Sequence, residues 1–295
     1  VFSIVAPGML GSHKQFKEVY AAPIAAGGPA GEEALARLRR RVRPVMMRRT
    51  KELVAPELPE RLEQVLEVEL DPKHRKVYDT YLQRERQRML GLLEDYEANR
   101  FAIFRSLTTL RRLALDASLV DPDLAGVPSS KLDVLMEQLA EVAAGGHRAL
   151  VFSQFTSYLA KAQNRLRAEG LEFAYLDGST TNRTAVIQGF KEGAAPVFLI
   201  SLKAGGFGLN LTEADYVFLL DPWWNPATEN QAIDRTHRIG QTRNVMVFRL
   251  VAGRTIEDKV MALKARKAAL FDAVLDAEGA FSGALTADDV RALLA

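Results

Sequence analysis

The chain has 295 residues, 48% of them hydrophobic and 26% charged, which is enough for one large domain or two modest domains with buried cores. It contains no cysteine, which excludes disulfides and thiolate zinc sites and fits an intracellular setting. The four histidines are scattered without metal-ligand spacing, so we predict no metal site. No apolar run reaches the length of a membrane span, and the first ten residues lack the basic start of a signal peptide. We therefore expect no membrane partner and a chain cut from a longer protein.

Positive charge is concentrated in two stretches, although the formal net charge is only +2. The first stretch holds Arg37, Arg39, Arg40, Arg41, Arg43, Arg48, Arg49 and Lys51, and the second holds Arg235, Arg238, Arg243, Arg249 and Arg254. Such clusters attract polyanions by neutralising phosphates, but a solvated basic face gives the same pattern. Charge alone therefore leaves nucleic-acid binding undecided.

The first 120 residues are predicted to contain helices and connectors. Residues 1 to about 66 combine loops with one helix, which runs from Glu32 to just before Pro44, and end in a proline-punctuated segment that behaves like a connector. From Asp71, which has the properties of an N-cap and precedes Pro72, apolar residues recur at helical spacing to about Val120. We interpret this part as a helical insertion made of two helices.

Beyond a linker-like stretch at 121–130, short apolar runs alternate with amphipathic stretches. The apolar runs are 149–153, 173–177, 196–201, 216–221 and 245–250, and the helical stretches are 156–169, 181–191 and 255–275. Strands that alternate with helices predict an α/β fold with a parallel sheet covered by helices on both faces. Ligands of such sheets gather at the carboxyl ends of the strands.

Polar and small residues follow four of these predicted strands. They are Ser153 with Gln154, Asp177 to Thr180, the run SLKAGGFGLNL after 200, and DPWWNP after 220. A row of hydroxyls, glycines and backbone N–H groups along one rim suits a phosphate backbone, because small residues let amides reach the oxygens. Asp-Gly and Gly-Gly also mark ordinary turns, but four such strand ends on one rim favour phosphate binding.

The glycine-rich run from Ser201 to Leu211 does not match a known phosphate-binding loop. Leu211 stands where the third glycine of G-x-G-x-x-G belongs, and the sequence contains neither a Walker A loop nor an Asp-Glu-x-x box for magnesium. The chain therefore lacks the phosphate cradle of a nucleotide site.

The segment from Gln231 to Gln241 is predicted to be a helix with two arginines on one face. Arg235 and Arg238 are three residues apart, Gln231 lies one turn before Arg235, and Gly240 ends the run as a C-cap would. A planar, permanently charged guanidinium suits phosphate oxygens, so two of them aimed one way indicate a clamp for a transferring phosphoryl group. The alternative is a solvated basic face.

Trp223 and Trp224 are the only tryptophans, and they follow a predicted strand on a proline-flanked loop. A tryptophan in this position either stacks on a base or packs over a core, and we weigh Trp223 slightly more toward packing.

Taken in order, these segments resemble the C-terminal half of a Swi/Snf-type ATPase, a double-stranded-DNA translocase of helicase superfamily two. LGSHKQFKEVYAAPI and RVRPVMMRRTKELVAPELPER resemble the tail of the first lobe and its linker, and SSKLDVLMEQL leading into ALVFSQF resembles the entry to the second RecA-like lobe with motif IV. SLKAGGFGLNL resembles motif V, and DPWWNPATENQAIDRTHRIGQ resembles the stretch that ends in motif VI. The last two are highly specific, and the form is closest to the bacterial members.

The resemblance implies a role for each matching residue. Arg235 and Arg238 match the two motif VI arginines that reach an ATP held by the first lobe, and Gln231 matches the glutamine that starts that motif. Gly206, Gly208 and Asn210 are expected to contribute to cofactor binding. The positions expected along the DNA are Ser153, Gln154, Gly178, Ser179, Lys203, Ala204, Gly205, Trp224 and Asn225. Phe207 replaces a residue that is commonly smaller, from which we expect only local repacking.

The resemblance also implies a division into residues 1–66 (tail of the first lobe and linker), 67–128 (helical insertion) and 129–295 (second RecA-like lobe with C-terminal helices). ATP with Mg²⁺ would be bound mainly by the missing first lobe, upstream of Val1. The implied partners are duplex DNA and that first lobe, in a monomeric, cytoplasmic, nucleoid-associated bacterial protein. The isolated chain would be inactive. Two alternatives stay open: a nucleic-acid-binding or protein-interaction module with no ATPase role, and a strand-separating helicase.

Overall fold

The computed structural model describes residues 5–45, 55, 57–204, 209–223, 226–274 and 287–294. The chain divides into two compact units, residues 1–57 and 58–295. Each unit has its own internal packing and is described separately.

The first unit is helical. Its elements are α2 (His13–Phe16), the π-helical turn η1 (Lys17–Ala21), α3 (Ala22–Ala26), α4 (Gly28–Val42) and η2 (Arg43–Val45). Ser12 caps α2 because its hydroxyl accepts a hydrogen bond from the Gln15 N–H, and the Gln15 side chain accepts one in return from the Ser12 N–H. The helix predicted from Glu32 is α4, which begins one turn earlier and ends before Pro44, as expected.

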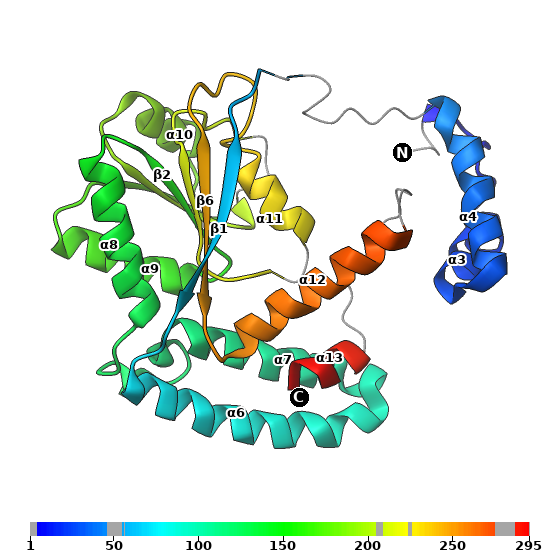
Figure 1. The fold of residues 1–295 in the computed structure, drawn as a ribbon, viewed down its shortest axis with the longest axis horizontal. Helices are drawn as coiled ribbons and strands as arrows, with labels where there is room; N and C mark the ends of the chain where they lie inside the picture. Colours follow the sequence, from blue (N-terminus) through cyan, green and yellow to red (C-terminus); the bar gives the residue numbers. More distant parts are fainter. Residues whose placement is uncertain are drawn as a thin grey trace. The chain divides into compact units, whose positions relative to one another are not determined.

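The second unit is built on a six-stranded parallel sheet (Figure 1). The strands are β1 (Arg61–Val68), β2 (Ala149–Ser153), β3 (Phe173–Leu176), β4 (Val197–Ser201), β5 (Tyr216–Leu219) and β6 (Val245–Ala252), in the order β1-β6-β5-β2-β4-β3. All five predicted strands are present, and the parallel α/β fold class is confirmed.

The segment that we interpreted as a connector contains a strand. β1 pairs in parallel with β6, from Arg61 opposite Val245 to Val68 opposite Ala252, and forms one edge of the sheet. Our boundary at residue 66 therefore falls inside β1. An edge strand exposes much of its surface, so its charged positions do not produce the continuous apolar run that marks the buried strands.

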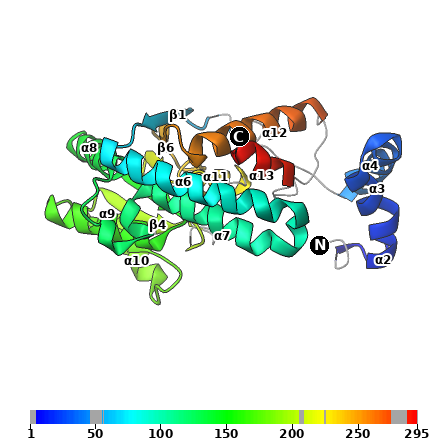
Figure 2. The ribbon, with the colours of Figure 1, turned by 90° about the horizontal axis from the view of Figure 1, so that it is seen from below.

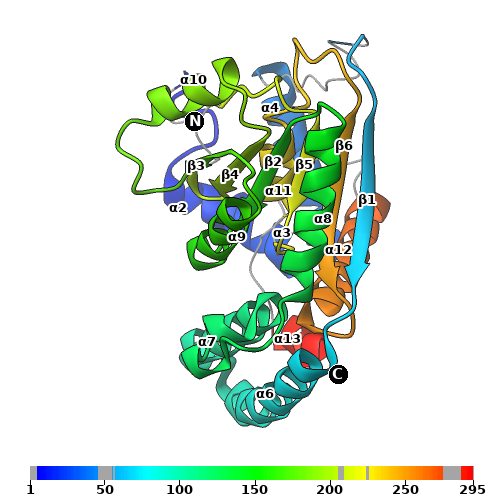
Figure 3. The same cartoon turned by 90° about the vertical axis from the view of Figure 1, so that its left-hand side faces the viewer.

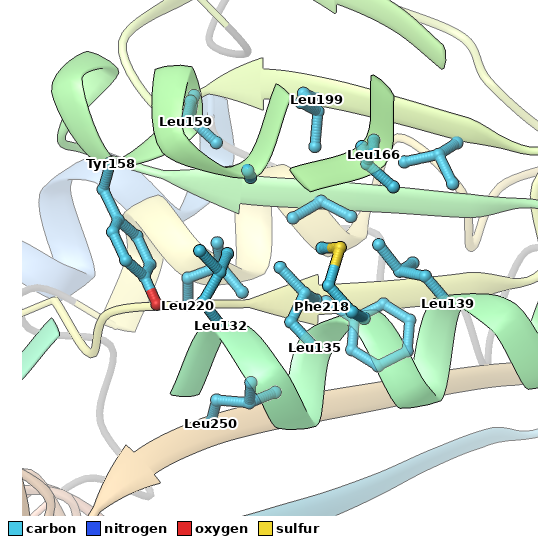
Figure 4. Close-up of a cluster of buried hydrophobic side chains, with 14 of the residues drawn as sticks. Leu132, Leu135, Leu139, Tyr158, Leu159, Leu166, Leu199, Phe218, Leu220 and Leu250 are labelled. Carbon is cyan, nitrogen blue, oxygen red and sulfur yellow. The ribbon is translucent and has the colours of Figure 1, made fainter. Parts of the chain in front are cut away.

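Helices cover both faces of the sheet, as predicted. On one face α8 (Ser130–Ala144) and α9 (Thr156–Ala168) pack against the strands (Figure 3). Figure 4 shows that core: Leu135 and Leu139 of α8 and Leu159 of α9 lie against strand side chains that include Leu199 and Phe218. On the other face α10 (Arg183–Glu192) and α11 (Pro226–Ile233) contribute Phe190 and Ile233 to a second core. Burial on two faces explains why β2 and β4 are apolar at nearly every position.

The helical insertion consists of α6 (Pro72–Leu92), the short turn η3 (Leu93–Asp95) and α7 (Tyr96–Leu115), followed by the turns η4 (Ala117–Leu119) and η5 (Pro122–Leu124). The Asp71 carboxylate accepts a hydrogen bond from the Lys73 N–H, so the predicted N-cap is confirmed. The predicted apolar positions of α7, Ile103, Leu107 and Leu110, are buried against α12 (Ile256–Val274) and α13 (Ala287–Leu294) (Figure 2). The insertion is thus packed onto the C-terminal helices of the same unit.

Candidate functional site

The loops that we singled out all lie at the end of the sheet where the parallel strands finish. The parallel strands β5, β2, β4 and β3 are neighbours in that order, so the loops that follow them form a continuous row. We call this row the rim and define it as residues 154–155, 177–180, 203 and 222–223. Of the predicted DNA contacts, Gly178, Ser179 and Lys203 are exposed on the rim, and Gln154 is half-buried there.

The rim turn after β3 is held by one carboxylate. Asp177 accepts hydrogen bonds from the Ser179 N–H (2.8 Å) and hydroxyl (2.7 Å), and from the Tyr175 hydroxyl (2.8 Å). The bond from Ser179 is the main reason why the pKa of Asp177 is lowered. A side chain at Gly178 would meet only open space, so a ligand can approach the backbone closely at this position.

Two predicted DNA contacts lie beneath the rim instead of on it. Ser153, the last residue of β2, is 0% exposed, and its hydroxyl accepts a hydrogen bond from the Phe155 N–H at 3.0 Å. Ala204 is also buried, and its carbonyl accepts a hydrogen bond from the guanidinium of Arg183 at 2.7 Å. Both positions support neighbouring rim residues, because side chains without exposed surface make no direct contact with a ligand.

Several backbone N–H groups in the loops of the rim are already engaged, although we expected them to point toward phosphate oxygens. The Gln154 N–H donates to Asp221 (3.2 Å), the Ala204 N–H to the hydroxyl of Ser201 (3.3 Å), and the Trp223 N–H to Glu229 (2.7 Å). A buried amide takes a partner inside the protein where one is available. The exposed side chain of Lys203 is the cation that the rim presents on its surface.

Buried charges support the rim from below. Asp221 is fully buried, and burial raises its pKa to about 6 although Arg111 opposes that shift. Arg111 comes from α7, lies 3.7 Å from the Asp221 carboxylate, and donates to the carbonyl of Pro222 at 2.7 Å. Lys131, at the start of α8, donates to the carbonyl of Leu220 (2.5 Å) and pairs with Glu257 (2.7 Å). Sequence reasoning missed these residues, and their only signal is a charged residue at an otherwise apolar helical position.

The two arginines do not lie on a helix. α11 ends at Ile233, and residues 234–241, which we call the arginine segment, consist of turns and bends. The Leu211 N–H donates to the carbonyl of Arg235 at 2.9 Å. The side-chain amide of Gln241 donates to the carbonyls of Ala214 (2.8 Å), Thr212 (3.2 Å) and Thr236 (3.3 Å). Regular helix ends at Ile233, so our helix prediction is wrong from Asp234 onward.

The arginine segment lies on the side of the sheet where β5 and β6 begin, because its partners at 211–214 directly precede β5. Arg235 is only 8% exposed, whereas Arg238 is exposed. Burial lowers the pKa of Arg235, and the positive charge of Arg238 lowers it further against the influence of Asp234. The positive charges of the two guanidiniums therefore influence each other.

Two of the other predicted nucleotide contacts are described. Gln231 is exposed on α11, one turn before the arginine segment. Asn210 is exposed and precedes Leu211, which is hydrogen-bonded to Arg235. The fold thus brings the end of the glycine-rich run next to the arginines, as a shared nucleotide site requires.

Several predicted residues lie outside the described part of the chain, namely Gly205, Gly206, Gly208, Trp224 and Asn225, and so does Phe207. Among the residues that are described, no group of three or more His, Asp or Glu side chains is placed to hold a metal ion. The described helices include none with the length and apolar character needed to cross a bilayer.

A parallel sheet of this order, with helices on both faces and functional residues at its loops, defines a RecA-like α/β domain. The family described as "SNF2-related domain" matches residues 1–119, and "Helicase conserved C-terminal domain" matches residues 130–240. The chain belongs to the Swi/Snf (SNF2-related) family of helicase-like ATPases.

Similar proteins occur in several bacteria. An "Uncharacterized ATP-dependent helicase" of Mycoplasma pneumoniae is 34% identical over 297 residues, which cover 99% of this chain and 28% of the relative. The "Putative ATP-dependent helicase/translocase YwqA" of Bacillus subtilis is 32% identical over 288 residues, or 94% of this chain and 31% of the relative. The chain therefore spans about a third or less of the length of these relatives.

Two solved structures share the fold. The "Sulfolobus solfataricus SWI2/SNF2 ATPase core in complex with dsDNA" is 28% identical with a TM-score of 0.62, and the match covers 99% of this chain and 62% of that one. The "C-terminal part of Fun30 ATPase domain" is 23% identical with the same TM-score of 0.62, over 80% of this chain and 96% of that one, which supports the fold alone.

Proposed function

We propose that this chain supplies the second RecA-like lobe of an ATP-dependent translocase that moves along duplex DNA. In this proposal residues 1–66 are the tail of the first lobe and the linker, 67–128 the helical insertion, and 129–295 the second lobe. The observation that carries it is the pair Arg235 and Arg238, held without a phosphate cradle beside Asn210. Such a pair has a use only when another lobe presents a triphosphate.

The arginine segment would act on ATP bound by the upstream lobe. Arg238, which is exposed, would reach the transferring phosphoryl group, and Arg235 would hold it from one side while Gln231 and Asn210 contact the nucleotide. Gly206 and Gly208 would complete this surface. An arginine finger typically contributes about 10³ to 10⁵ in rate, which corresponds to roughly 4 to 7 kcal/mol of barrier. Carboxylates of the upstream lobe would hold Mg²⁺, and the ion would neutralise part of the phosphate charge.

The rim would bind the DNA backbone. Lys203 would neutralise a phosphate, with Ser179, Gln154, Trp224, Asn225 and Gly205 alongside it on the path of the DNA backbone. Exposed small and polar residues at neighbouring strand ends support this assignment, as does the duplex DNA named for the related archaeal core. Binding through phosphates would be independent of sequence and would weaken strongly with salt.

Closure of the two lobes would link these sites. ATP favours a closed state in which the arginines engage, and hydrolysis releases it, so the grip on the DNA backbone shifts with each cycle. The rim lies where the strands end, and the arginine segment lies where β5 and β6 begin. This separation suits a lobe that binds DNA and ATP at the same time. This chain alone would have no ATPase activity, because the phosphate cradle belongs to the other lobe. We also propose a monomeric, nucleoid-associated protein.

The test is the steady-state ATPase rate of the full-length protein with duplex DNA, with single-stranded DNA and with none. We expect stimulation by duplex DNA, little stimulation by single strands, and no unwinding of a forked duplex. A binding module would show no ATPase activity under any condition. A strand-separating helicase would respond to single strands and unwind the fork, which would replace our proposal.

A further inference from the structure

A buried carboxylate joins the rim to the helix that leads to the arginine segment. Glu229 of α11 is 1% exposed. It accepts hydrogen bonds from the Trp223 N–H at 2.7 Å, from Lys264 Nζ at 2.8 Å and from Arg249 Nε at 3.2 Å. Its three partners come from the rim, from α12 and from β6. Arg235 lies two residues beyond the end of α11.

The charges around Glu229 fix its position. A carboxylate buried this deeply is tolerated only when it is paired, and here two cations oppose it. Burial lowers the pKa of Lys264, and Glu229 opposes that shift. Burial also acts to lower the pKa of Arg249, but hydrogen bonding to Glu63 of β1 and the charge of Glu229 raise it overall. The sheet edge and the C-terminal helix therefore hold this carboxylate rigidly against the rim.

The same rim residues are held from the opposite direction by the helical insertion. Arg111 of α7 donates to the carbonyl of Pro222 at 2.7 Å, and its guanidinium lies 5.3 Å from the ring of Trp223. Arg111 is also 3.7 Å from Asp221. Residues 221–223 thus contact both Arg111 of α7 and Glu229 of α11. Of these two helices, α11 is the one that leads to the arginine segment.

We propose that Glu229 is a positioning residue that couples the rim to the arginine segment. DNA that displaces residues 221–223 pulls on the bond between the Trp223 N–H and Glu229, and α11 transmits the displacement to Arg235 and Arg238. α11 connects the two regions, because Glu229 lies within it and the arginine segment follows its last residue, Ile233. Glu229 thereby makes ATP hydrolysis respond to DNA. This inference rests on the proposed function of the two sites.

The principal test compares Glu229→Gln with wild type in the full-length protein. Glutamine has nearly the same shape as glutamate but no charge, so the ion pairs with Lys264 and Arg249 are lost. The side-chain oxygen that accepts the Trp223 N–H is then held less firmly. We expect the ratio of DNA-stimulated to DNA-free ATPase turnover to fall about tenfold, within the usual range of coupling between sites. The DNA-free turnover and the KM for ATP stay at wild-type values.

Lys264→Met provides a second, milder variant, because Glu229 then keeps its pair with Arg249. Its stimulation ratio should fall by a smaller factor than that of Glu229→Gln. The matched control is Lys161→Met, which also removes a lysine from a largely buried carboxylate, Asp116 at 3.1 Å, but lies away from the rim. The control should keep the wild-type ratio.

Tryptophan emission gives an independent readout, because the backbone N–H of Trp223 is hydrogen-bonded to Glu229. Glu229→Gln should shift the emission of the DNA-free chain to longer wavelength as Trp223 gains exposure, and Lys161→Met should not. The coupling role would be overturned if Glu229→Gln and Lys264→Met both kept the wild-type stimulation ratio. An equal loss of stimulated and DNA-free turnover would also overturn it. A wild-type protein without any stimulation by DNA would overturn the proposed function itself, together with this inference.

Discussion

The rim and the arginine segment are held in place by different means. Beneath the rim, Asp221 and Glu229 are buried and each faces a cation. The arginine segment instead relies on main-chain hydrogen bonds and on Gln241, and it leaves Arg238 exposed. Loss of a buried partner leaves a charge without compensation, whereas an exposed guanidinium can be neutralised by a ligand. Removal of charge should therefore change stability beneath the rim and chemistry at the arginine segment.

The largest effect is expected at Arg238. In the full-length protein, Arg238→Ala should lower ATPase turnover about 10³- to 10⁵-fold, because the transition-state charge loses its finger. ATP binding and the free energy of unfolding should change little, since the side chain is exposed. Steady-state turnover, nucleotide binding and urea unfolding measure the three quantities. Arg243→Ala is the control, because that exposed arginine already pairs with Asp215. Turnover within a few-fold of wild type would contradict the role of Arg238.

Beneath the rim, Lys131→Met should act on stability. Lys131 and its partner Glu257 are both 0% exposed, so the variant leaves a buried carboxylate without its cation. We expect the free energy of unfolding to fall by about 3 to 5 kcal/mol in urea titrations. Arg165→Gln, which breaks the exposed pair with Asp133, should cost less than about 1 kcal/mol. Similar losses for both variants would mean that burial does not distinguish the two pairs.

The sequence was sufficient to predict five of the six strands and the rim, because burial on both faces produces apolar runs. β2 and β4 are buried along their whole length, and polar residues begin where each strand ends. The same logic located Gln154, Ser179 and Lys203 on one edge, since parallel strands end on the same side. Periodicity and strand ends are local signals, so a single sequence contains them.

The remaining features depend on contacts between distant segments. β1 is defined by its pairing with β6, more than 170 residues away, and its own sequence is that of a charged, half-exposed stretch. After Ile233 the chain leaves the helix, and the arginine segment is hydrogen-bonded to the loop at 211–214 through Leu211 and Gln241. Neither event leaves a local signature. The pairing of Arg111 with Asp221 likewise joins two segments whose charges give no sign of burial when read separately.

The pH dependence of Asp221 gives a finer measure of how the rim is held. Its folded pKa, about 6, lies above its ordinary value of 3.8, so the folded state holds the proton more tightly than the unfolded state. The group therefore contributes stability that is fully present below about pH 4 and is lost as pH rises through 6, up to about 3 kcal/mol. Asp221→Asn removes this contribution.

Urea unfolding of wild type and Asp221→Asn at several pH values between about 4 and 7 checks the sign. The stability of wild type relative to the variant should decline as pH rises over this range. A constant difference would mean that Arg111 holds the pKa of Asp221 near its ordinary value and that the ion pair is stronger than burial implies.

The smallest effect is expected at Lys203, the exposed cation of the rim. Lys203→Ala should weaken duplex binding only a few-fold, because it removes one phosphate contact among several. It should also reduce the slope of log affinity against log salt by about one, so the difference from wild type is largest at low salt. Fluorescence anisotropy with a labelled duplex, measured from about 50 to 200 mM salt, resolves the two slopes. Equal slopes for wild type and Lys203→Ala would mean that Lys203 does not contact the DNA. The binding surface would then be restricted to the residues that follow β3 and β5.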